Sequence, residues 1–167
     1  MKQSDQSKEY TFDEILKDRG YLVYTNVGVS MMPLLRQRKD IIEIRSKDPG
    51  VRCKRYDAVL YKRGDKYILH RILKVRPNDY VICGDNNIRR EYGITDEMIL
   101  GVMVRVIRNG KSIYPTDWEY RLYVHLWCDF FYVRAAILCA RKIIAVVFNR
   151  LKSLKDCMRQ IRTKWII

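Results

Sequence analysis

The sequence predicts a mainly β domain, a small barrel or coiled sheet, followed by a C-terminal α-helical tail. Residues 40–107 contain short apolar-rich runs, and turn sequences such as Asp-Pro-Gly and Asn-Gly separate them. Several short strands at this spacing, without long helices between them, favour a barrel or coiled sheet. After residue 115 the apolar residues recur at steps of three and four, which is helical periodicity. We therefore expect an N-terminal helical lead-in over 1–20, a β domain over 21–115 and a helical tail over 116–167.

The lead-in is predicted to hold one short helix, from Thr11 to Arg19. Thr11 can act as its N-cap, Glu14 completes a capping box and Gly20 ends it. The following "YLVYTNVGV" is predicted to be a strand that runs into a turn at Ser30. The first 21 residues contain no apolar stretch, so we expect neither a signal peptide nor a membrane anchor there.

The tail is predicted to be a basic amphipathic helix. Charged residues interrupt each of its apolar runs before the run reaches the ~20 residues that a membrane span needs. Two interpretations remain open. The apolar stripe packs against the β domain, against itself or against another copy of the chain, or the face over 118–167 lies on an anionic membrane surface.

The formal net charge of +14 indicates attraction to anionic partners. No zinc finger, basic zipper or RNA-binding aromatic motif accompanies the charge, which disfavours nucleic acid as the partner. The five cysteines form no Cys-x-x-Cys pair and only two histidines are present, so we expect no metal site. This cysteine usage is typical of a reducing compartment, and we expect a cytoplasmic protein, either free or peripheral at the membrane.

Three polar residues could form a serine nucleophile site. Ser30 lies in "NVGVSMMPLL", His70 in the alternating run "YILHRILKV" and Asp85 in "YVICGDNN". A serine nucleophile needs a base to take its proton and a third group to orient that base. Gly28 would let a substrate backbone approach, and Pro33 would fix the chain beyond Ser30.

These segments resemble the signal peptidase I family of serine peptidases. "SMMPLL" is similar to the nucleophile box of that family, and "VICGDNN" is similar to its Gly-Asp-Asn box. Between them, "YDAVLYKR" and "LHRILKV" are similar to the two strands that follow the nucleophile box. The resemblance covers Tyr21 to Arg108. The resemblance implies a mostly β serine endopeptidase that uses no cofactor. Ser30 would be the nucleophile, and His70 the base where most bacterial members have lysine. The oxyanion would be met by the Ser30 backbone amide, between Gly28 and Met31.

Two carboxylates compete for the third catalytic position. We prefer Asp85, in the Gly-Asp-Asn box, and retain Glu91 as the alternative because histidine-type relatives can use an acid beyond that box. The expected function is cleavage of a leader or signal peptide, or of a regulatory protein. The alternative is a non-catalytic peptidase-fold module that binds anionic partners or a membrane surface through its tail.

Overall fold

The computed structural model describes residues 10–164, so residues 1–9 of the predicted lead-in and Trp165 of the apolar stripe lie outside it. The chain divides into two compact units between Asp129 and Phe130. This division does not coincide with the change in sequence pattern near Pro115. The first tail helix belongs to the same unit as the strands.

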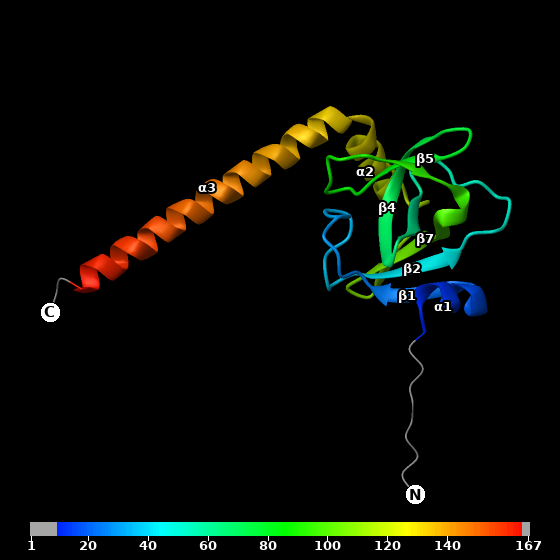
Figure 1. The fold of residues 1–167 in the computed structure, drawn as a ribbon, viewed down its shortest axis with the longest axis horizontal. Coiled ribbons are helices and arrows are strands. Elements are labelled where there is room, and N and C mark those ends of the chain that lie inside the picture. The colour runs from blue at the N-terminus through cyan, green and yellow to red at the C-terminus, as the bar shows by residue number, and fades with distance from the viewer. Residues whose placement is uncertain (1–9, 165–167) are drawn as a thin grey trace, which may run out of the picture. The chain divides into compact units, whose positions relative to one another are not determined.

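The first unit is built on an eight-stranded antiparallel sheet (Figure 1). Its strands are β1 Tyr21–Thr25, β2 Ile41–Ser46, β3 Ala58–Arg63, β4 Lys66–Val75, β5 Tyr80–Cys83, β6 Glu91–Ile94, β7 Ile99–Arg108 and β8 Lys111–Ile113. They are ordered β1-β2-β7-β3-β4-β5-β6, and β8 pairs with β7. Within residues 10–164 no pairing joins β1 to β6, so the sheet is open. The predicted barrel is therefore wrong, and the fold is mixed α/β: an open sheet followed by two helices.

The first strand is shorter than the sequence pattern predicts. β1 ends at Thr25 instead of continuing to Val29. The next residue, Asn26, leaves the strand because its side-chain amide donates to the Gly28 carbonyl at 2.9 Å, while its own carbonyl accepts from the Arg38 amide at 2.7 Å. Ser30 lies in a turn, as predicted, but five residues beyond the end of the strand. Strand β6 and the 3-10 turn η1 Asp96–Met98 were not predicted.

The short N-terminal helix α1, Phe12–Arg19, is confirmed together with its capping box. The Thr11 hydroxyl accepts from the Glu14 amide at 3.3 Å, and the Glu14 carboxylate accepts from the Thr11 amide at 2.8 Å. Gly20 ends the helix in the left-handed conformation, with φ 75°. Leu16 anchors α1 in the core beneath β1 and β2.

The sheet buries side chains on both faces, which decides where the polar residues point. Along β3, Ala58 and Leu60 join one apolar cluster, whereas Val59 and Tyr61 join the other. This alternation is the ordinary consequence of strand geometry. His70 and Arg71, adjacent on β4, must therefore point to opposite faces of the sheet.

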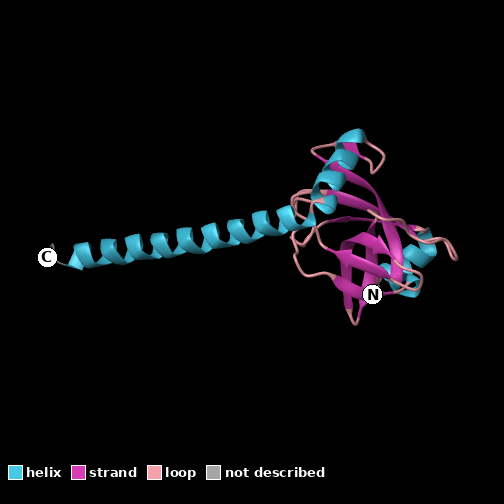
Figure 2. Ribbon diagram, turned by 90° about the horizontal axis from the view of Figure 1, so that it is seen from above, coloured by secondary structure: helices cyan, strands magenta, loops and turns pink. Residues whose placement is uncertain are grey.

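Two helices follow the sheet: α2 spans Trp118–Asp129 and α3 spans Phe131–Lys164 (Figure 2). Three residues of α2 pack into the first apolar cluster: Tyr120, Val124 and Cys128. The predicted continuous helical tail is thus divided at Phe130. Among the helices of residues 10–164, none combines the length and the hydropathy that a membrane crossing requires.

Candidate functional site

Ser30 lies in the connection between β1 and β2, and buried contacts fix both ends of this loop. At one end the Asn26 amide donates to the Asp40 carbonyl at 3.1 Å. The buried Asp40 carboxylate in turn accepts from Arg36 and Arg108, and these contacts lower its pKa although burial opposes the charge. Next to Ser30, Met31 is 1% exposed and belongs to the core. The loop is therefore held in one conformation around the predicted nucleophile.

Gly84 brings Ser30 and His70 to the same point. A Cβ atom on Gly84 would lie 2.6 Å from the Ser30 carbonyl oxygen and 2.9 Å from His70 Cδ2. The Ser30 carbonyl also accepts from the Asn86 amide at 2.7 Å. A residue with a side chain could not occupy position 84 without moving Ser30 or His70 apart.

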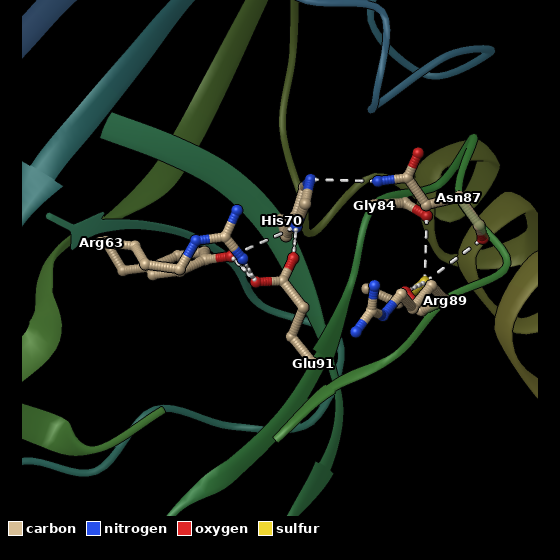
Figure 3. Close-up of polar contacts among 8 residues, drawn as sticks. Arg63, His70, Gly84, Asn87, Arg89 and Glu91 are labelled. Atoms are coloured by element: carbon tan, nitrogen blue, oxygen red, sulfur yellow. Dashed lines mark hydrogen bonds and ion pairs between the residues drawn. The ribbon is translucent and has the colours of Figure 1, made fainter. Parts of the chain in front are cut away.

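His70 has three polar partners: Glu91 and Tyr61 at Nδ1, with the Tyr61 hydroxyl at 3.4 Å, and Asn87 at Nε2; Figure 3 shows it between Glu91 and Asn87. Its Nδ1 lies 2.8 Å from Glu91 Oε1, and its Nε2 lies 3.4 Å from Asn87 Nδ2. Because a carboxylate can only accept, we assign the Nδ1 proton to the bond with Glu91, which leaves the Nε2 lone pair as the basic site. Burial lowers the pKa of His70, and Glu91 only partly opposes this effect. His70 is thus neutral and able to accept a proton near pH 7.

The carboxylate of Glu91 is itself oriented by two donors from β3. The Tyr61 hydroxyl donates to Glu91 Oε2 at 2.8 Å, and Arg63 forms an ion pair with the same oxygen (Figure 3). Tyr61 is fully buried, and burial followed by the bond to Glu91 raises its pKa. The phenol therefore stays protonated and acts as a donor.

Asp85, the preferred third group, does not contact His70 through any hydrogen bond of the described residues. Its two oxygens accept from Arg71 Nε at 2.9 Å and Nη2 at 2.8 Å, and both side chains are completely buried. Burial disfavours the Arg71 charge, but the Asp85 carboxylate outweighs this effect and raises the pKa of Arg71. The structure therefore places the alternative, Glu91, beside the histidine and gives Asp85 a buried ion pair.

Strand register explains this exchange of partners. Arg71 pairs with Cys83 and shares its face, and the turn after Cys83 brings the Asp85 carboxylate to the Arg71 guanidinium. Glu91 pairs with Ile82, which pairs with Ile72, and Ile72 shares its face with His70. The two carboxylates thus belong to opposite faces of the sheet.

Helix α2 holds the loop that carries Asp85. Trp127 Nε1 donates to the Asp85 backbone carbonyl at 2.7 Å, and the Tyr123 hydroxyl donates to its carboxylate at 3.1 Å. Tyr120 accepts from Arg71 at 3.0 Å. Since the same loop contains Gly84, these contacts fix the position at which Ser30 and His70 meet.

A cavity of about 350 Å³ lies beside Ser30. It is lined by Phe12, Tyr24, Asn26, Val27, Gly28, Ser30, Tyr67, Ile68 and Leu69. A Cβ atom at Gly28 would meet no heavy atom of the described structure within 4 Å, so the packing of the chain does not itself require glycine there. An extended peptide could therefore approach the backbone at Gly28 and place a side chain in the cavity.

The structure brings together Ser30, His70 and Glu91 of the predicted residues, with Gly28 and Met31 on either side of the nucleophile. The Ser30 hydroxyl forms no hydrogen bond with His70 in the described chain, and the nearest polar partner of Nε2 is Asn87. Sequence reasoning missed the supporting residues Tyr61, Arg63, Gly84, Asn87, Tyr123 and Trp127. The alternation of Tyr61 and Arg63 in "DAVLYKR" could have placed them on one face. No cluster of three His, Cys, Asp or Glu residues suited to a metal ion occurs within residues 10–164.

Comparison with known proteins adds no relative to this description. No protein-family model, curated protein sequence or solved structure matches the chain.

Proposed function

We propose that this protein is a serine endopeptidase similar to signal peptidase I, with Ser30, His70 and Glu91 as its catalytic groups. The observation that carries the proposal is the hydrogen bond of 2.8 Å between His70 and Glu91, formed where Gly84 brings the imidazole against the Ser30 loop. A buried histidine whose Nδ1 bonds a carboxylate has its Nε2 available as a base. The resemblance of "SMMPLL" to the nucleophile box of signal peptidase I supports Ser30 as the nucleophile, and this support does not depend on the geometry of His70.

The reaction follows from these roles. Ser30 Oγ attacks the carbonyl carbon of a peptide bond as His70 Nε2 takes the hydroxyl proton, and the resulting oxyanion is met by the Ser30 backbone amide. His70 returns the proton to the leaving amine when the carbon–nitrogen bond breaks. A water molecule then attacks the ester carbonyl carbon and gives a proton to His70 Nε2. His70 passes this proton to Ser30 Oγ as the ester carbon–oxygen bond breaks, which releases the new carboxyl group and restores neutral His70 and Ser30. Glu91 stabilises the imidazolium in both steps.

This cycle requires one rearrangement around His70. Asn87 must release Nε2, and the Ser30 side chain must turn toward it. Catalytic hydrogen bonds are often long or poorly aligned before a substrate binds and tighten in its complex. The distance of 3.4 Å between Asn87 and His70 is that of a weak contact, which a stronger one can replace.

Labelling with a serine-reactive probe tests the proposal directly. Purified protein is treated with a fluorophosphonate or a peptide boronate at mildly alkaline pH, and the modified residue is found by mass spectrometry. We expect labelling at Ser30 that is lost in Ser30→Ala and in His70→Ala. The matched controls Ser46→Ala and His125→Ala remove an exposed serine and the other histidine, and they should label normally.

If the probes do not label the protein, cleavage of a peptide library tests whether it is a peptidase. We expect the folded wild-type protein to cleave leader-type peptides and Ser30→Ala to leave them intact. Cleavage that persists in Ser30→Ala would refute the assignment of the nucleophile. A folded protein that neither labels nor cleaves would refute the peptidase proposal and favour the non-catalytic binding module.

A further inference from the structure

Helix α3 has a wide apolar face that the described chain leaves exposed. Every side chain from Cys139 to Lys155 is exposed. At 3.6 residues per turn seven of the large apolar side chains from Ile137 to Met158 fall within an arc of about 120°, whereas Ile143 borders this arc and Val146 lies outside it. The exposed residues within the arc are Ile137, Ile144, Val147, Phe148, Leu151, Leu154 and Met158.

The charges around this face are mainly positive. From Phe131 to Met158 the helix contains one carboxylate, Asp156, and six basic residues: Arg134, Arg141, Lys142, Arg150, Lys152 and Lys155. On the helix surface Arg141 and Lys152 lie along one edge of the apolar arc and Arg150 lies along the other, whereas Lys155 falls within the arc. Long basic side chains at these edges can extend their charged ends to the level of lipid headgroups.

These features favour a lipid surface over a second copy of the helix. An apolar arc of about 120° is wider than the narrow seam that a two-stranded coiled coil uses. Paired helices would also bring rows of like charge together with only Asp156 to balance them, whereas coiled coils commonly pair opposite charges beside the seam. An anionic membrane supplies both an apolar interior and the missing negative charge.

We propose that α3 binds in the plane of an anionic lipid bilayer, with Phe148 and Leu151 inserted among the acyl chains and the basic edges at the headgroups. The apolar stretch from Ile137 to Met158 would lie along the surface for about 32 Å at 1.5 Å per residue. The proposal does not depend on peptidase activity, so the Ser30→Ala protein should bind vesicles as the wild type does.

The charge dependence is tested by flotation of the full-length protein with vesicles. We expect binding to phosphatidylcholine vesicles that contain phosphatidylserine, weak binding to phosphatidylcholine alone, and loss of binding as salt rises. Arg150→Glu with Lys152→Glu should reduce the affinity by about a hundred-fold or more. The control Lys66→Glu with Lys111→Glu changes the net charge of the protein by the same amount, but at two positions on the sheet. This variant should retain most of the affinity. Equal loss in both variants, or no binding by the wild type, would overturn the proposal.

The insertion of the apolar face is tested by polar substitution. Phe148→Ser with Leu151→Ser should reduce affinity for the same anionic vesicles by about a hundred-fold, because two large apolar side chains no longer leave water. Asn149→Ala, opposite the arc, should have little effect, and circular dichroism of each variant shows whether the helix is retained. Analytical sedimentation without lipid tests whether the apolar face of α3 instead binds a second copy of the chain. A dimer that the Phe148 and Leu151 substitutions abolish would assign the face to a second copy and overturn the lipid proposal.

Discussion

Replacing Asp85 by asparagine tests whether Asp85 stabilises the fold through its ion pair with Arg71 or acts in catalysis. Asp85 and Arg71 have no exposed side-chain surface and are joined by two charge-assisted hydrogen bonds of 2.8 and 2.9 Å. Asp85→Asn keeps the shape but removes the charge, and its amide group presents donors where Arg71 and Tyr123 also donate. Removing one partner of a buried ion pair commonly lowers the free energy of unfolding by about 3–5 kcal/mol, because the other charge remains unpaired in the interior. We expect a loss of stability in that range.

The measurement is urea-induced unfolding of Asp85→Asn beside Glu91→Gln. Glu91 is a half-buried carboxylate with 17% of its side chain exposed, and Gln can keep an acceptor for Tyr61. We therefore expect a smaller loss of about 1–2 kcal/mol for Glu91→Gln. Its main effect should be on turnover, which should fall by about a thousand-fold or more because the imidazolium loses its counter-charge.

Two results would refute this division of roles. One is an Asp85→Asn protein of nearly wild-type stability whose turnover is abolished, since that would return the catalytic acid to Asp85. The other is a Glu91→Gln protein with unchanged turnover. A double substitution strengthens the test: Arg71→Met with Asp85→Leu removes both buried charges and should recover much of the lost stability.

The remaining predictions concern the surroundings of His70. Gly84→Ala should lower the unfolding midpoint and reduce kcat/KM by about a hundred-fold, because its Cβ would force Ser30 or His70 from position. Gly28→Ala should leave the unfolding midpoint unchanged, and equal midpoints for the two variants would contradict this reasoning. The pH profile of kcat/KM should rise through a midpoint below about 6.5, because burial lowers the pKa of His70 although Glu91 opposes the effect, and a midpoint above that value would contradict it. Stability should likewise fall as the pH drops below about 6.5, because the unfolded chain then takes up a proton that folded His70 does not. Tyr61→Phe should lower kcat about ten-fold through the lost bond to Glu91, and an unchanged kcat would exclude a positioning role for the phenol.

The sequence was sufficient to predict most strands, because their signals are local. Alternating apolar residues and turn sequences locate β2, β3, β4, β5 and β7 within a few residues. The capping box of α1 is equally local, since Thr11 and Glu14 are three residues apart. The open edge of the sheet could not be predicted in this way. Closure depends on whether β1 and β6 pair, and neither strand carries a feature that decides it.

Strand β6 shows why the sequence did not place Glu91 beside His70. Its sequence "EYGI" is short and contains a glycine, so it lacks the pattern by which strands are recognised. Without β6, Glu91 had no assigned position relative to His70. Asp85, in a segment that resembles the Gly-Asp-Asn box, was therefore preferred, and Glu91 was retained only because histidine-type relatives can use an acid beyond that box.

The buried arginine next to His70 offered a signal that strand alternation makes usable. In "LHRILKV" the histidine and Arg71 must point to opposite faces of any strand that contains them. An arginine within a buried strand needs a carboxylate, since an unpaired buried charge is strongly destabilising. If the Gly-Asp-Asn segment supplies that carboxylate on one face, the histidine on the other face requires a different acid. The fully buried pair of Arg71 and Asp85 is consistent with this reasoning, and it makes Glu91 the acid that remains for His70.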